Sequence, residues 1–254
     1  VCPTQAGALI IKQAREILVQ VGKIKNIIEE EKNELSGTFR IGILPTIAPY
    51  LIPRFFQQMV KKYPKLDISV REMKTPDIKQ ALLKGDIDAG ILAELSDMDE
   101  YNHTHLFYEE FFAYVSRNDI LFNKKVITSA DLSGELLWLL DEGHCFRDQI
   151  VRFCSIMASR ENRLTYQLGS METFMRMVES GMGITFIPEL AEMQLSEPQK
   201  ELVRPFAIPI PTRELILITN KNFIRQTLLD TVVKEIQAAV PKNMLKLGAG
   251  QVLV

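Results

Sequence analysis

The chain has 254 residues, of which 46% are apolar and 24% are charged, so it can bury one large hydrophobic core or two smaller ones. Its formal net charge is -2, from 30 basic and 32 acidic side chains, and this balance does not indicate a phosphate-binding surface. No apolar run is long enough to span a bilayer and no signal peptide is found, so we expect a cytoplasmic protein without membrane contact. Because the chain starts at Val1, we also expect a preceding segment.

The first 35 residues predict one long helix that pairs with a second copy. Thr4 is a good N-cap, and apolar residues then recur at alternating steps of four and three. These residues are Ile10, Ala14, Ile17, Val21, Ile24 and Ile28, and the pattern returns at Leu35. An amphipathic helix packed on its own domain is the alternative, but it usually carries a wider apolar stripe. We therefore interpret residues 1–35 as a linker and dimerisation helix.

Beyond Ser36, strand-like and helix-like segments alternate in two series. The first series is strand 38–44, a helix ending near 63, strand 66–71, helix 77–84 and strand 87–92. The second is strand 136–140, helix 146–158, strand 164–169, helix 172–180 and strand 184–187. Such alternation predicts α/β units with parallel strands and helical crossovers. We expect strands 106–108 and 213–219 to connect the two units, and 223–240 to form a closing helix.

Cys145 lies between an apolar segment and a predicted helix, and therefore at a helix N-terminus. The helix dipole and the neighbouring side chains of His144 and Arg147 favour a thiolate, which is the form that reacts with peroxides. In the opposing interpretation, the acidic residues of this loop cancel the local field and leave the cysteine inert. These acidic residues are Asp141, Glu142 and Asp148. Spacing alone leaves both interpretations open.

Cys154 is expected to point into the core, on the apolar face that the same helix presents through Phe146 and Ile150. It lies 154 - 145 = 9 residues after Cys145, which corresponds to roughly 13 Å of continuous helix. A disulfide requires Cα atoms about 4.4 to 6.8 Å apart. The two thiols can therefore bond only if the helix unwinds or the Cys145 loop moves. Cys2 is interpreted as incidental.

Neither a metal nor a cofactor is expected. His103 and His105 could share a face of a strand, and His144, Cys145 and Cys154 could contribute to a zinc site, but the second set lacks a clear fourth ligand. The sequence contains no phosphate-binding loop, no serine-nucleophile motif and no dinucleotide fingerprint. We therefore do not expect an enzyme.

Several segments together resemble the LysR-type transcriptional regulators. In chain order they are Thr4 to Gly7, Gly37 to Gly42, Leu51 to Pro53, Tyr63 with Pro64, Gly85 to Asp88, and Val178 to Ile184 followed by Pro188. The resemblance implies two Rossmann-like subdomains of the periplasmic-binding-protein type, joined by a double crossover. Residues 36–108 plus 214–254 would form the first subdomain and 109–213 the second. It also implies that the DNA-binding helix-turn-helix precedes this chain.

Gly143 to Gln149, followed by Phe153 and Cys154, resembles the redox segment of the hydrogen peroxide sensors in that family. The resemblance implies that peroxide oxidises Cys145 to a sulfenic acid, which then forms a disulfide with Cys154, with glutaredoxin or thioredoxin as reductant. It further implies that Thr46 and Thr75 hold peroxide and that His144 and Arg147 assist the thiolate. The working unit would be a homodimer or homotetramer on promoter DNA, in contact with RNA polymerase.

Three other functions remain open at this point. A regulator of the same family could bind a small organic effector in the cleft between two lobes, with incidental cysteines. A solute-binding protein would have similar lobes but would leave the N-terminal apolar pattern unexplained. A thiol peroxidase would turn over steadily with a thioredoxin system.

Overall fold

The computed structural model describes residues 35–93, 98–133, 135–140, 145–154 and 170–254, together with positions 3–7, 9–11, 13–14, 17, 21, 24 and 27. Within this part of the chain, no helix combines the length and the hydropathy needed to cross a membrane.

The helices and strands alternate along most of the chain. The strands are β1 (Gly37–Ile43), β2 (Leu66–Glu72), β3 (Ala89–Ala93), β4 (Tyr101–Val115), β5 (Ile184–Pro188), β6 (Val203–Pro205), β7 (Ile210–Asn220) and β8 (Gln251–Leu253). The α-helices are α2 (Ala48–Lys62), α3 (Thr75–Lys84), α4 (Cys145–Phe153), α5 (Met171–Glu179), α6 (Glu189–Glu192), α7 (Glu197–Lys200) and α8 (Gln226–Ala239). Short 3-10 helices are η1 (Ile120–Asn123), η2 (Ser129–Leu132) and η3 (Lys242–Leu245).

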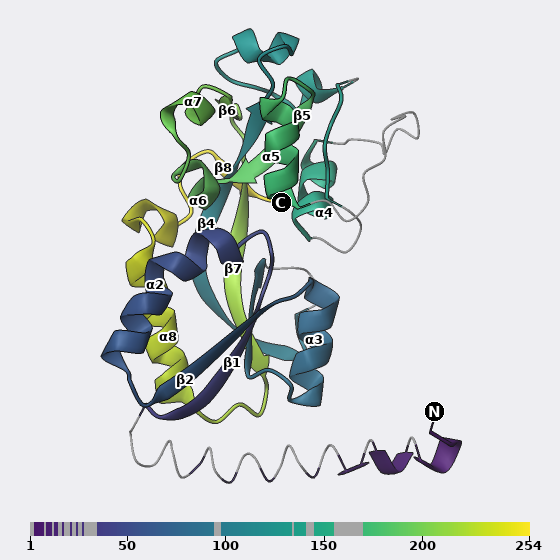
Figure 1. Ribbon diagram of the computed structural model, residues 1–254, viewed down its shortest axis with the longest axis vertical. Helices are drawn as coiled ribbons and strands as arrows, with labels where there is room; N and C mark the ends of the chain where they lie inside the picture. Colours follow the sequence, from purple (N-terminus) through teal and green to yellow (C-terminus); the bar gives the residue numbers. More distant parts are fainter. Residues whose placement is uncertain are drawn as a thin grey trace.

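One strand path, β2-β1-β3-β7-β4-β5, runs through the whole molecule, with β6 paired to β4 and β8 paired to β7. The pairs β1–β2 and β1–β3 are parallel, whereas β3–β7, β4–β7 and β4–β5 are antiparallel. The long strands β4 and β7 continue from one half of the molecule into the other (Figure 1). They are therefore the two connections of the double crossover.

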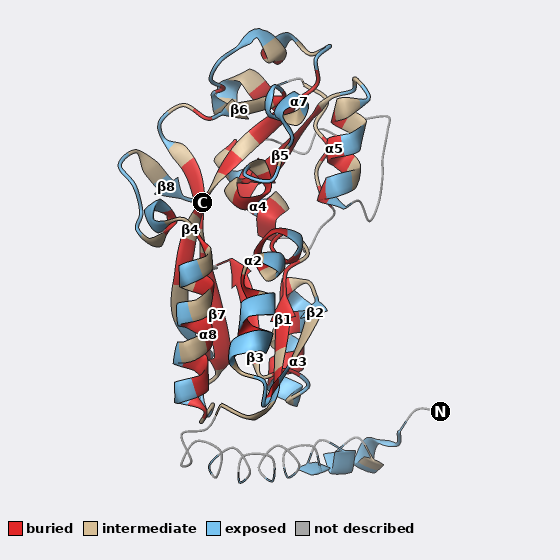
Figure 2. Cartoon of the chain, turned by 60° about the vertical axis from the view of Figure 1, so that its left-hand side comes forward, coloured by how far each residue is buried: buried red, intermediate tan, exposed pale blue. Residues whose placement is uncertain are grey.

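The molecule has two lobes (Figure 1). The first lobe contains β1, β2, β3, α2, α3 and α8, and the second contains α4, α5, α6, α7, β5 and β6. The strands β3, β5 and β7 are buried almost throughout, whereas β2, β6 and β8 are partly exposed. The helices expose their outer faces (Figure 2). Buried apolar side chains from both lobes form one continuous cluster, so the seam between the lobes is part of the core.

Two of the segments that resemble the LysR-type regulators, Gly37 to Gly42 and Gly85 to Asp88, lie against each other in the first lobe. The Arg40 guanidinium donates to both carboxylate oxygens of Asp88, at 2.9 and 3.0 Å, and Asp88 also accepts the Arg40 backbone N–H at 2.8 Å. Gly85 ends α3 in the left-handed region, with φ 72°, which glycine adopts without steric cost. The motif residues thus fix the turn between α3 and β3.

Most predicted elements of the first lobe are confirmed. Strands predicted at 38–44, 66–71 and 87–92 correspond to β1, β2 and β3, which are parallel as expected. In the N-terminal segment the described positions from 5 to 27 are helical. The Thr4 hydroxyl accepts the Gly7 N–H at 3.1 Å, as expected of an N-cap.

One predicted element of the second lobe is wrong. Residues 136–140 form no strand, only an isolated parallel bridge between Leu137 and Ile184. The strand β5 pairs along its other edge with β4, in the antiparallel sense. Among the described residues, the Leu137–Ile184 bridge is therefore all that forms of the parallel pairing predicted here. The predicted strand 164–169 lies outside the described residues. The proposed boundaries at 108/109 and 213/214 stay a prediction.

Candidate functional site

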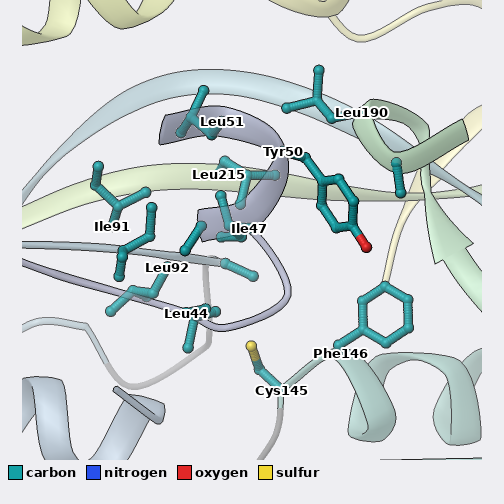
Figure 3. Packing of buried hydrophobic residues seen from close by; sticks show 14 of the residues in the cluster. Leu44, Ile47, Tyr50, Leu51, Ile91, Leu92, Cys145, Phe146, Leu190 and Leu215 are labelled. Atoms are coloured by element: carbon teal, nitrogen blue, oxygen red, sulfur yellow. The ribbon is translucent and has the colours of Figure 1, made fainter. Parts of the chain in front are cut away.

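Cys145 is the first residue of α4, where the sequence places it, and its side chain is almost completely buried, with 4% exposed. The sulfur atom points from α4 toward the apolar side chains around Leu44 and Leu92 of the first lobe (Figure 3). The thiol therefore lies at the seam where the second lobe meets the first.

Burial raises the pKa of the Cys145 thiol above its ordinary value, because a thiolate loses its hydration in an apolar seam. The charge of Arg213, the Thr75 hydroxyl and the backbone N–H groups of Ala93 and Phe146 each lower the pKa, but together they do not offset burial. Burial therefore favours the protonated thiol in this closed arrangement, a question that the spacing of the sequence left open. The groups that would stabilise the anion nevertheless surround the sulfur.

Arg213 is the cation of the site, and its side chain is fully buried. Its guanidinium donates two hydrogen bonds to Glu109 Oε2, at 2.9 and 2.7 Å. The same group donates to the hydroxyl and the carbonyl oxygen of Thr46, at 3.2 and 3.3 Å, and it lies over the ring of Phe146 at 5.1 Å. A charge held by this many bonds keeps its position beside the sulfur.

The two threonines singled out from the sequence both lie in this seam. Thr75 starts α3, and its hydroxyl is close enough to Cys145 to lower the thiol pKa. The Thr75 hydroxyl has no hydrogen-bond partner among the described residues. It is therefore able to bond an incoming ligand. Thr46 accepts hydrogen bonds from Arg213, whose charge acts on the sulfur.

Cys154 is buried in the second lobe at the far end of α4. Its backbone N–H donates to Ile150 O at 2.9 Å, so the helical hydrogen bonding continues up to this residue. Burial raises the pKa of Cys154 to about 12. Both cysteines are free thiols, held apart by about 13 Å of helix rise.

The structure describes only one of the other two predicted site residues. His144 lies outside the described residues. Arg147 pairs with Asp148, with Nη1 3.5 Å from Oδ1, and lines a small apolar space between α4 and α5. The guanidinium that acts on Cys145 is that of Arg213.

Tyr50 closes the seam beside Cys145. Its hydroxyl, which points toward Phe146 (Figure 3), donates to Glu172 Oε1 on α5 at 2.5 Å. Its carbonyl oxygen accepts from Gln194 of the second lobe at 3.2 Å. These bonds tie α2 of the first lobe to the second lobe and keep bulk water away from the thiol.

A family model described as the LysR substrate binding domain matches residues 32–241. The chain belongs to the LysR family. A hydrogen peroxide-inducible genes activator of Dickeya chrysanthemi is 30% identical over 246 residues, which cover 97% of this chain and 80% of that protein. The DNA-binding transcriptional dual regulator OxyR of Escherichia coli K12 is 32% identical over 215 residues, covering 85% and 70%. A crystal structure of OxyR from Porphyromonas gingivalis superimposes with a TM-score of 0.81 at 48% identity, covering 86% of this chain and 99% of that one.

These relatives are transcription regulators rather than enzymes, and the fold of this LysR domain matches the crystal structure of the P. gingivalis protein. The expected periplasmic-binding-protein-like architecture is therefore confirmed.

The sequence did contain a signal for the residue it failed to assign. Arg213 and Glu109 each interrupt an apolar strand of the LysR domain, and they are directly opposed in the β4–β7 register. A charged residue inside an apolar strand is buried only when it is paired. The missing information was the register, because the two residues are more than a hundred positions apart.

Glu189 gives this LysR domain a pH-dependent stability. Burial, together with the charges of Glu110 and Glu109, raises the pKa of Glu189 to about 7, against the lowering effect of bonds from the Glu110 N–H and Asn243. The folded protein thus keeps a proton that the unfolded chain releases above its ordinary pKa of 4.5, and stability must fall as pH rises from there to about 7. Glu189→Gln should therefore raise the free energy of unfolding above pH 7 by about 1–2 kcal/mol, discounted for the partial exposure of this side chain.

Urea unfolding at about pH 5 and about pH 8 measures this effect. Glu192→Gln, at the other carboxylate of α6, is the matched control and should preserve the pH dependence of the original protein. An equal pH dependence in Glu189→Gln and the original protein would contradict the assignment.

Proposed function

We propose that this chain is the regulatory region of a LysR-type transcription factor that senses hydrogen peroxide through Cys145. The observation that carries the proposal is the position of the sulfur in the seam between the lobes, beside the Arg213 guanidinium and the Thr75 hydroxyl. The names of the relatives support the same function.

In the first step, peroxide enters the seam and the Cys145 thiol loses its proton. Admission of a polar molecule reduces the desolvation that raises the thiol pKa, while Arg213, Thr75 and the backbone N–H of Ala93 remain to stabilise the thiolate. The thiolate attacks one oxygen of hydrogen peroxide, a sulfur–oxygen bond forms, and the oxygen–oxygen bond breaks. Hydroxide leaves and takes up the proton as water, so the sulfur is oxidised by two electrons to a sulfenic acid.

In the second step, the Cys154 thiolate attacks the Cys145 sulfenic sulfur. A sulfur–sulfur bond forms, the sulfur–oxygen bond breaks, and the oxygen leaves as water after protonation. Since α4 runs from Cys145 to Phe153 and Cys154 follows it directly, this bond requires the helix to unwind. A dithiol reductant such as glutaredoxin or thioredoxin would return both cysteines to thiols.

A small organic effector is less compatible with this seam. Buried side chains of Ile47, Tyr50 and Phe146 occupy the space beside Cys145 where the lobes meet (Figure 3). An effector would have to displace them and break the bond between Tyr50 and Glu172. The thiol, by contrast, requires space only for a molecule of two oxygen atoms.

Peptide mass mapping of untreated and peroxide-treated protein tests the proposal. We expect a peptide pair linked through Cys145 and Cys154 after treatment with micromolar peroxide, and no linkage before it. In Cys154→Ser the treated protein should instead carry added oxygen on Cys145, because no resolving thiol is present. An unmodified Cys145 under both conditions would overturn the proposal.

The N-terminal apolar pattern makes a second prediction, about assembly. Ile17, Val21 and Ile24 are all more than half exposed in the single chain, at 57%, 57% and 62%. A second copy would cover them in a coiled coil. Replacing both Ile17 and Ile24 with lysine should reduce the molecular mass in solution to half or less of its original value, as measured by light scattering. Lys23→Glu with Lys25→Glu, at the two neighbours of Ile24 in the sequence, is a control that changes charge without removing an apolar residue of the pattern. An unchanged mass in the isoleucine variant would contradict dimerisation through this helix.

In the complete regulator we place this region in the cytoplasm, as part of a homodimer or homotetramer on promoter DNA. Contact with DNA would come from the helix-turn-helix that precedes it, and contact with RNA polymerase would follow at the promoter. The disulfide would alter lobe packing and thus the spacing of the DNA-binding units.

A further inference from the structure

The chain crosses between the lobes a third time, after α8. Residues 240–254, which we call the strap, contain η3 and β8 and leave the first lobe at the end of α8. The strap ends beside α4 in the second lobe (Figure 1). β8 pairs in parallel with β7 at Ile210 to Thr212. The strap therefore connects the lobes in addition to β4 and β7.

A small set of hydrogen bonds holds the strap. Asn243 donates to Glu189 Oε1 at 3.5 Å, and Gln251 donates to Glu110 Oε1 at 2.6 Å. The backbone bonds to β7 run from the Ile210 N–H to Gly250 O, at 2.8 Å, and from the Val254 N–H to Thr212 O, at 3.1 Å. Within the described chain the strap also has apolar contacts, because Val240 and Met244 are buried in the core cluster and Leu245 and Val254 pack against it. The residues of β8 are more exposed, and hydrogen bonds hold this part of the strap.

One further bond joins the strap to the redox helix. Gln149 lies four residues after Cys145 and therefore on the same face of α4. Its side chain is 1% exposed, and its amide nitrogen donates to Val254 O at 2.8 Å. Its amide oxygen is buried without a hydrogen-bond partner among the described residues. The glutamine is therefore placed in the core for this bond to the strap, at the cost of an unpaired oxygen.

The strap also borders the other half of the site. Thr212, which accepts the Val254 N–H, directly precedes Arg213, whose charge acts on the Cys145 sulfur. The strap thus lies next to both Arg213 and Gln149, and each of these residues is a neighbour of Cys145. The Gln149 side chain gives a change in α4 a direct route to the strap.

We propose that Gln149 is a positioning residue that clamps the strap to α4 in the thiol form, and that the Cys145–Cys154 disulfide releases β8 from β7. The inference rests on the proposed function, because the disulfide is what unwinds the helix. Gln149 lies between the two cysteines, so it leaves Val254 when α4 unwinds. The strap then loses its bond to α4, and the pairing of β8 with β7 loses the support of the redox helix.

Hydrogen exchange followed by mass spectrometry tests this on the full chain. We expect peptides that cover 207–213 and 248–254 to exchange at least tenfold faster in the peroxide-treated protein than in the reduced protein. In Cys154→Ser treated with the same peroxide, Cys145 gains oxygen but α4 has no reason to unwind, so exchange in the strap should stay slow. A disulfide confirmed by mass, together with unchanged exchange in the strap, would overturn this inference alone. Absence of the disulfide would overturn both proposals.

Gln149→Leu provides an independent measurement, because leucine fills similar space without the amide. In this variant the strap should exchange at least fivefold faster even in the reduced protein. Peroxide should remove the Cys145 thiol at the original rate, whereas closure of the disulfide should be faster, since the clamp no longer opposes unwinding. Arg152→Leu, at an exposed position of α4, is the control and should change neither rate. Slow exchange in the strap of a folded Gln149→Leu protein would refute the clamp, and if this variant does not fold, the comparison of reduced and oxidised original protein decides alone.

Discussion

Cys145→Ser should abolish the response to micromolar hydrogen peroxide. A serine hydroxyl is not oxidised by peroxide, and Cys154, with its pKa raised to about 12 by burial, is almost entirely a thiol at neutral pH and reacts slowly. The side chains have similar volumes, so we expect the variant to fold with a loss of about 1–2 kcal/mol. Mass mapping after peroxide treatment should show no linkage and no added oxygen at Cys154.

Cys2→Ser is the control for this prediction, since Cys2 is interpreted as incidental; it should respond to peroxide at the original rate. Oxidation of Cys154 in Cys145→Ser at the rate measured for the original protein would show that the roles of the two thiols are exchanged. Loss of the response in Cys2→Ser would instead identify a third participating cysteine.

The first lobe could be predicted from sequence because its signals are local. Alternating apolar residues, a proline near the start of α2 and Gly85 after α3 each fix an element within a few residues. The segment 136–140 was misread because every residue in it is apolar. A continuous apolar run does not distinguish a strand from buried irregular backbone. Whether such a run forms a strand here depends on which edge of β5 is free to pair with it.

For the site, sequence position was informative and net electrostatics were not. Cys145 at a helix start and Cys154 in the core followed from helical spacing, and both are confirmed. The direction of the thiol pKa shift stayed open in the sequence because it depends on burial against the first lobe, more than fifty residues earlier in the chain. Arg147 was preferred over Arg213 for the same reason: proximity along the chain is visible in a sequence, whereas proximity across two strands is not.

Arg213→Met should both destabilise the fold and slow the oxidation of Cys145. Removal of the guanidinium leaves the Glu109 carboxylate buried and unpaired, which costs about 3–5 kcal/mol and should lower the Tm by roughly 6–20 °C for a chain of this size. The same change removes the positive charge that lowers the Cys145 pKa, so the rate of thiol loss under peroxide should fall at least tenfold. Stopped-flow kinetics and thermal unfolding measure the two effects separately.

A second substitution separates the two effects of Arg213. Glu109→Gln in the Arg213→Met background removes the orphaned charge but keeps an acceptor for the Leu190 N–H, which Glu109 Oε1 accepts at 3.0 Å. Stability should then recover by several kcal/mol, while oxidation stays slow because the cation is still missing. If stability and oxidation rate recovered together, Arg213 would matter only for the fold. The electrostatic role of Arg213 requires that stability recovers while the oxidation rate does not, since only the oxidation rate depends on a positive charge beside the sulfur.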